Sequence, residues 1–110
     1  MDSYEIIMTP DAADDLVTLR DYISGTLLSP DTALAYIRML RMEIGMLSVM
    51  PERHKCVDDE PWRSREVRRI IKKNFIVYYR IDKTARRVYI LNVIYAKRDQ
   101  LQILAQISID

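Results

Sequence analysis

The stretch from residue 63 to residue 98 constrains the fold most, because it reads as three β-strands separated by short polar turns. From Phe75 to Ile81, apolar and aromatic residues alternate in the pattern of a strand. Residues 87–95, RVYILNVIY, are apolar on both faces, which is typical of a central strand. β-Branched and aromatic residues dominate both segments and suit a pleated surface.

A shorter strand precedes these two and carries Val67, Ile70 and Ile71. It ends at the polar turn Lys72-Lys73-Asn74, where Asn tolerates the positive φ that a tight hairpin needs. The next turn is expected at residues 82–85. Together the three segments predict an antiparallel meander.

The first half of the chain predicts one strand and two helices. Residues 3–8, SYEIIM, form a short apolar run. Thr9-Pro10 and Ser29-Pro30 are both helix starts, with a hydroxyl residue as N-cap and Pro at the first helical position. Gly25 is a plausible C-terminal stop for the first helix, and Pro51 ends the second. The short break at residues 26–29 predicts an antiparallel helical hairpin.

Two apolar stripes at helical spacing should face the core. The stripe residues are Leu16, Leu19 and Ile23 in the first helix, and Ala33, Ile37, Leu40, Ile44 and Leu47 in the second. A second apolar flank of the later helix suggests that it packs on both a helix and the sheet; its residues are Tyr36, Met39, Met46 and Met50. Gly45 costs that helix about 1 kcal/mol relative to Ala, which a close helix crossing would explain.

The element order β-α-α-β-β-β therefore predicts a single α+β domain over residues 1–110. A helical hairpin should pack on one face of a mainly antiparallel sheet, followed by a short C-terminal segment, helical or extended, from residue 99. In the long loop 51–64, we expect Trp62 to fold back onto the core.

Charge is distributed very unevenly along the chain. The stretch 63–98 holds twelve of the 17 Lys and Arg residues and two acids, a net charge of +10, although the whole chain is only +1. Residues 1–62 are −7 and residues 99–110 are −2. Such asymmetry suggests a polyanion or an acidic partner. The residues expected to bind it are Arg63, Arg65, Arg68, Arg69, Lys72, Lys73, Arg80 and Arg98.

Several function classes are disfavoured by the residues present. The one His, His54, and the one Cys, Cys56, make a zinc site very unlikely. The three acids at residues 58–60 read as a solvated loop, and no cofactor motif is found. No apolar run approaches the ~20 residues of a membrane span. The single cysteine favours a reducing cytoplasm.

Arginine, lysine and tyrosine on a sheet could bind phosphates through charge-assisted hydrogen bonds. They could also cleave RNA without a metal, with the 2′-hydroxyl as nucleophile, Lys or Tyr moving protons and Arg stabilising the phosphate. The alternative is a basic, solvated sheet face that pairs with acidic neighbours.

The ordered set of elements carries a family resemblance. It comprises an early strand entering Thr9-Pro10-Asp11-Ala12, the loop MPERHK at 50–55, and the strands VRRIIKKNFIVYYRID and VYILNVIYAKRD. In this order they resemble the RelE/ParE superfamily, the toxins of type II toxin–antitoxin modules, also called plasmid stabilisation or addiction modules.

That resemblance implies one of two activities. RelE-like members cut messenger RNA at the ribosome, using an arginine where this chain has Ile76 and a tyrosine roughly at Leu104. Of their other basic positions, Arg69 and Arg98 match, while Val67 does not. ParE-like members poison DNA gyrase and lack the nuclease residues.

The resemblance therefore favours a ParE-like growth inhibitor acting on gyrase. The first alternative is a RelE-like endoribonuclease, metal-independent, with Arg69, Arg98, Tyr95 and Lys97 as candidate catalytic residues. The second is an inactive toxin-fold module that only binds its partner. The implied partner is a cognate antitoxin with an acidic or amphipathic segment, on the basic sheet and the apolar flank of the second helix. Any oligomer would form through that antitoxin.

Overall fold

The computed structural model describes residues 3–27 and 29–96. The elements follow the expected order: β1 (Glu5–Met8), α1 (Pro10–Leu27), α2 (Pro30–Gly45), the 3₁₀ turns η1 (Met46–Ser48) and η2 (Pro51–Arg53), β2 (Arg68–Lys72), β3 (Phe75–Asp82) and β4 (Arg87–Tyr95). The predicted α+β arrangement is confirmed. The segment expected from residue 99 lies outside the described residues.

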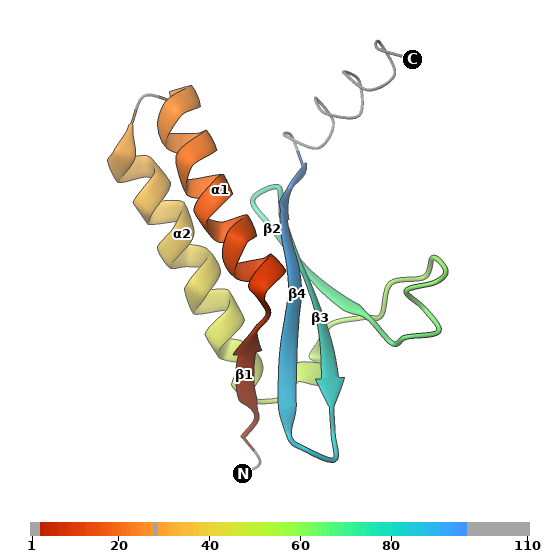
Figure 1. Cartoon of the computed structure of the whole chain (residues 1–110). Coiled ribbons are helices and arrows are strands. Elements are labelled where there is room, and N and C mark those ends of the chain that lie inside the picture. The colour runs from red at the N-terminus through yellow and green to blue at the C-terminus, as the bar shows by residue number, and fades with distance from the viewer. Residues whose placement is uncertain (1–2, 28, 97–110) are drawn as a thin grey trace.

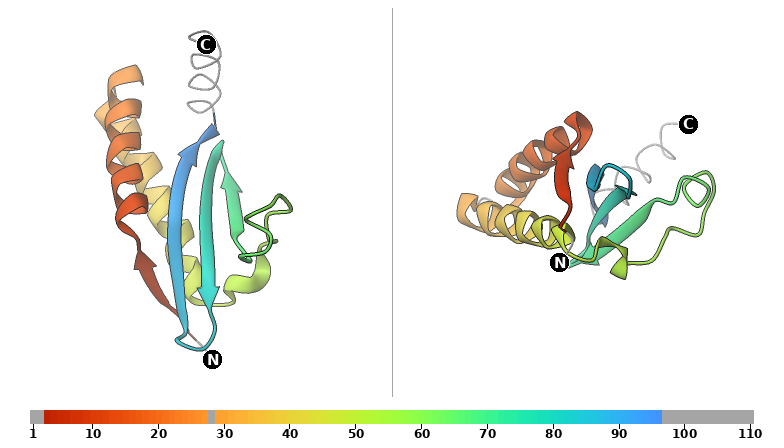
Figure 2. Two further views of the ribbon diagram at one scale, coloured as in Figure 1. Left: turned by 45° about the vertical axis from the view of Figure 1, so that its right-hand side comes forward. Right: turned by 90° about the horizontal axis from the view of Figure 1, so that it is seen from below.

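The four strands form one mixed sheet in the order β1-β4-β3-β2. β4 pairs antiparallel with β3, β3 pairs antiparallel with β2, and β1 runs parallel to β4. The helical hairpin covers one face of the sheet, and the other face carries no helix among the described elements (Figure 1). Figure 2 shows the same two layers after a 45° turn and from below, with the 51–67 segment beyond β2.

Thr9 joins the first strand to the first helix. Its hydroxyl donates to the carbonyl of Ile90 at 2.6 Å, and its Oγ1 accepts the backbone N–H of Ala12 at 3.3 Å. One side chain therefore ends the pairing of β1 with β4 and caps α1. Ser29 caps α2 in the same way, accepting the N–H of Thr32.

Gly25 does not end the first helix, contrary to the sequence prediction, because α1 continues to Leu27. A glycine stops a helix by adopting a positive φ, and neither glycine does so here. Gly45, in turn, is not at a close helix crossing: a Cβ built on it would meet nothing within 4 Å. The chain's own packing therefore gives no reason for either glycine.

The core lies between the hairpin and the sheet, and both predicted helix stripes point into it. All eight stripe residues are buried, together with Ile70, Phe75, Val77, Tyr79, Val88, Ile90 and Val93 from the sheet. Tyr36 and Met39 also pack against this core, as expected of a helix that contacts both layers. Met46 and Met50 do not; both are exposed.

The β2–β3 hairpin confirms the predicted turn. Lys73 and Asn74 have φ values of 49° and 69°, so both central residues are left-handed, as a type I′ turn requires. Five residue pairs join the two strands without a register shift.

Trp62 does not fold onto the core, and that expectation was wrong. Its side chain is 45% exposed. Val57 and Val67 are buried instead, held together by a 2.7 Å hydrogen bond from the N–H of Val57 to the carbonyl of Val67. The buried side chains of this segment are thus two small β-branched residues, and the indole remains exposed.

Candidate functional site

The face of the sheet opposite the helical hairpin, here called the open face, is apolar at its centre and basic at its rim. Strand alternation directs Ile76, Tyr78 and Arg80 of β3 to this face, because Val77 and Tyr79 point into the core. Their neighbours across the ladders are Arg69 and Ile71 on β2, and Tyr89, Asn92 and Ile94 on β4.

A shallow groove of about 180 Å³ lies on the open face. It is lined by Trp62, Val67, Tyr78, Leu91, Asn92 and Ile94. A β-bulge enlarges its apolar floor: Tyr78 pairs with Asn92 and Tyr79 pairs with Ile90, so Leu91 is an extra residue without a partner on β3. The exposed indole of Trp62 forms part of the groove's lining.

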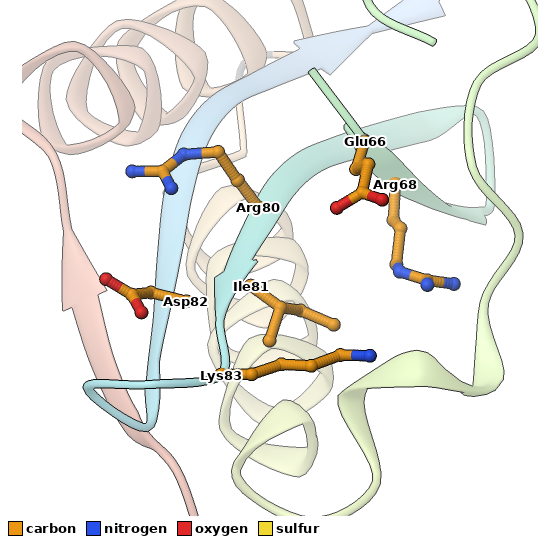
Figure 3. A pocket seen from close by; sticks show the side chains of 6 residues that line it. All are labelled: Glu66, Arg68, Arg80, Ile81, Asp82 and Lys83. Atoms are coloured by element: carbon orange, nitrogen blue, oxygen red, sulfur yellow. The ribbon is translucent and has the colours of Figure 1, made fainter. Parts of the chain in front are cut away.

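A second hollow, of about 410 Å³, is more polar and lies near the end of β3 (Figure 3). Its lining residues are Glu66, Arg68, Arg80, Ile81, Asp82 and Lys83. Figure 3 shows the guanidinium of Arg80 pointing away from Arg68 and Lys83. Arg80 lies over the ring of Tyr89, 4.8 Å from its centroid. The three cations therefore do not converge on one point where a phosphate could sit.

Arg68 has a structural task in this hollow. Its Nη1 donates to the carbonyls of Glu52 (3.2 Å) and His54 (2.7 Å), and so ties the η2 turn to the sheet edge. Lys83 pairs with the carboxylate of Glu52 at 3.4 Å. Arg68 and Lys83 therefore already have partners within the chain.

The basic residues expected to bind a partner are divided between different surfaces. Arg69 and Arg80 lie on the open face, on adjacent strands. Lys72 is on the helix side, where its Nζ pairs with Glu43 of α2 at 2.8 Å. Lys73 is in the hairpin turn. Arg63 and Arg65 are in the exposed turn before β2, while Lys97 and Arg98 are outside the described residues.

The candidate catalytic residues are not brought together among the described residues. Tyr95 is on the helix side of β4, where its ring stacks on Phe75 with centroids 4.7 Å apart and contacts Tyr22 at 6.4 Å. Arg69 projects from the opposite face of the sheet. A phosphate bound at Arg69 would therefore have the sheet between it and Tyr95.

The sequence analysis did not predict a role for the hydroxyl of Tyr79. It is fully buried, and its hydroxyl donates to the carbonyl of Pro51 at 2.6 Å. Burial raises the pKa of Tyr79 to about 12, although the nearby Arg68 opposes the shift. Burial and the neighbouring Arg53 lower the pKa of His54. The alternation of Val77 and Tyr79 was the available signal that this hydroxyl points inward.

No membrane-spanning or metal-binding feature is found in the described part of the chain. Neither helix there is long and apolar enough to cross a bilayer. No group of three or more His, Cys, Asp or Glu side chains in residues 3–27 and 29–96 is placed to hold a metal ion.

The described residues form a two-layer α+β domain with a helical hairpin on one face of a four-stranded sheet. The family model described as the ParE toxin of the type II toxin–antitoxin system parDE matches residues 6–100. The chain belongs to the ParE toxin family, and is thus a type II toxin component of the RelE/ParE superfamily.

Two solved structures share the fold. The chromosomal ParDE system of P. aeruginosa is 19% identical, with a TM-score of 0.69, covering 86% of this chain and 98% of that chain. The RelBE2 toxin–antitoxin complex of Mycobacterium tuberculosis is 24% identical, with a TM-score of 0.60, covering 86% and 93%. No curated protein sequence matches the chain significantly.

Proposed function

We propose that this toxin inhibits growth by acting on DNA gyrase in the cytoplasm. The match of the ParE toxin family to residues 6–100 carries the proposal. The resemblance noted above associates gyrase with the ParE-like branch and messenger RNA with the RelE-like branch. A chain of the ParE-like branch is therefore expected to act on gyrase rather than on messenger RNA.

The chemistry of the open face supports a protein target over RNA cleavage. Its centre is Ile76, Tyr78, Leu91 and Ile94, which can bury apolar surface against another protein. A nuclease of this fold would need a proton-transfer group beside a phosphate-binding arginine. Tyr95 is on the other side of the sheet from Arg69, and Tyr79 is buried with its proton committed to Pro51.

We also propose that a cognate antitoxin binds and inhibits the toxin. Both solved structures named above are toxin–antitoxin systems, which supports a partner of the same kind for this chain. The exposed arginines Arg38 and Arg41 on α2 suit a partner with an acidic segment, because opposite charges speed association and exclude wrong partners. On this proposal the chain belongs to an addiction or plasmid-stabilisation module.

The test is a supercoiling assay with purified toxin and gyrase, alongside inducible expression in a bacterial host. Gyrase poisoning should halt supercoiling in vitro, and in cells should induce DNA-damage signalling while pulse-labelled translation continues. Early loss of translation with cleaved messenger RNA would instead establish the RelE-like endoribonuclease. Normal growth and unimpaired supercoiling would establish an inactive binding module for that host.

The open face can be tested in the same assay. Tyr78→Ala with Ile94→Ala should weaken gyrase inhibition, since both side chains line the groove. Val17→Ala, on the exposed side of α1, is the matched control and should keep full inhibition.

A further inference from the structure

The second helix ends in an exposed patch that the fold itself does not use. Successive turns of α2 carry Arg38, Arg41, Met42 and Gly45, and Met46 follows at the start of η1; all five are exposed, and they are called the α2 patch. Met42 is 71% exposed and Met46 is 48% exposed. The next methionine along the chain, Met50, is 70% exposed and has a left-handed backbone with φ of 51°. Three large, flexible apolar side chains thus follow one another in solvent.

Gly45 lies within this patch. It lowers the helix stability of the free chain relative to Ala, and nothing in the chain's own fold requires a glycine there. Its φ and ψ of −60° and −32° are helical, so no turn requires a glycine. A Cβ at this position would meet nothing within 4 Å, so no neighbour in the chain requires one either. A glycine here leaves room for another backbone to approach the helix closely.

The charge around the patch indicates the chemistry of its occupant. Arg38 and Arg41 have no ion-pair partner among the described residues. Arg53 adds a third guanidinium beside the patch, with its Nη2 donating to the carbonyl of Met46 at 3.1 Å. A complementary partner would present an apolar stripe with carboxylates on its flank. Methionine surfaces adapt well to such helices.

We infer that the α2 patch docks an amphipathic, acidic helix of the antitoxin, with Gly45 at the point of closest approach. This inference rests on the proposed antitoxin partner and adds which surface it covers. It separates two surfaces of the toxin: the open face of the sheet for the target, and the outer face of α2 for the antitoxin. Of the flank expected from the sequence, Tyr36 and Met39 belong to the core, whereas Met46 belongs to the patch.

The two glycines provide a matched pair of variants. Gly45→Gln places a long, uncharged helix former in the patch, while Gly25→Gln does the same in α1, where a Cβ also meets nothing within 4 Å. Both replacements should raise the Tm of the free toxin by a few degrees, because Gln favours a helix over Gly. Only Gly45→Gln should weaken antitoxin binding, by at least about tenfold, since its side chain occupies the docking space.

The probe is the polypeptide encoded next to this chain's gene, titrated calorimetrically into wild-type toxin and each variant. Arg38→Glu with Arg41→Glu should also lose affinity, most at low salt. If the wild type binds and Gly45→Gln binds equally well, the docking site is refuted. If the wild type itself does not bind, the proposed antitoxin partner is refuted. A concentration-dependent toxin dimer that Gly45→Gln dissociates would assign the patch to a second copy and overturn the inference.

Discussion

Removing the Tyr79 hydroxyl tests how the η2 turn is fixed to the sheet. Tyr79 is fully buried and donates to the carbonyl of Pro51 at 2.6 Å. Tyr79→Phe preserves the ring and leaves that carbonyl without its donor. A lost buried hydrogen bond of this kind costs about 1–2 kcal/mol. For a chain of this size we expect a fall in Tm of about 4–10 °C at neutral pH.

The same variant has a distinctive pH dependence. Burial raises the pKa of Tyr79 to about 12 from its ordinary value of 10.0. The unfolded chain therefore loses this proton at lower pH than the folded chain. The stabilisation from Tyr79 is fully present below pH 10 and is lost as the pH rises toward 12. Because Phe does not titrate, the stability difference between wild type and Tyr79→Phe should narrow across that window.

The measurement is urea unfolding followed by far-ultraviolet circular dichroism at pH 7, 9 and 11. Tyr78→Phe is the control: it removes the hydroxyl of the adjacent residue, which lies on the open face and is only partly buried. It should change the free energy of unfolding by less than about 0.5 kcal/mol. Equal stability of wild type and Tyr79→Phe at pH 7, with parallel pH curves, would refute the proposed link between η2 and the sheet.

Three further predictions concern single contacts. Asp15→Ala should lower the free energy of unfolding by about 1–2 kcal/mol, because its Oδ2 accepts the N–H of Val93 at 2.9 Å where β4 has passed the end of β1; unchanged urea curves would contradict this. Lys73→Gly should raise stability by about 0.5–1 kcal/mol, since glycine adopts the positive φ of that turn without strain, and a lower Tm would count against the type I′ turn. The Lys72–Glu43 ion pair should contribute less than about 1 kcal/mol and vanish in a double-mutant cycle at 1 M salt, because Lys72 is about half exposed.

Much of the fold follows from local patterns. The N-cap hydroxyls of Thr9 and Ser29, the two helical stripes and the strand alternation are all signals within a few residues. Errors arose where the outcome depends on distant parts of the chain. Trp62 is an apolar residue in a loop, and only the folded structure shows that Val57 and Val67 are buried in this segment while Trp62 stays exposed.

The site was harder to predict because like residues have unlike environments. Arg68 and Arg69 are neighbours in sequence, yet one ties down a turn and the other projects from the open face. Composition counts both as positive charge. Tyr95 was a candidate beside Arg69, but strand alternation places it against Phe75 on the helix side. Register, which a charge count ignores, decides which of these residues can act together.

The parallel pairing of β1 with β4 has a consequence for how the toxin is made. Residues 5–8 pair with residues 87–90, so β1 cannot enter the sheet until β4 has been synthesised. A nascent chain that has emerged only as far as β3 can form its helical hairpin and its β2–β3 hairpin, but it lacks β4, the strand that pairs with both β1 and β3. Contacts this distant in sequence form late. The sheet can therefore close only after β4 has left the ribosome, which gives a partner already present time to meet the toxin as it folds.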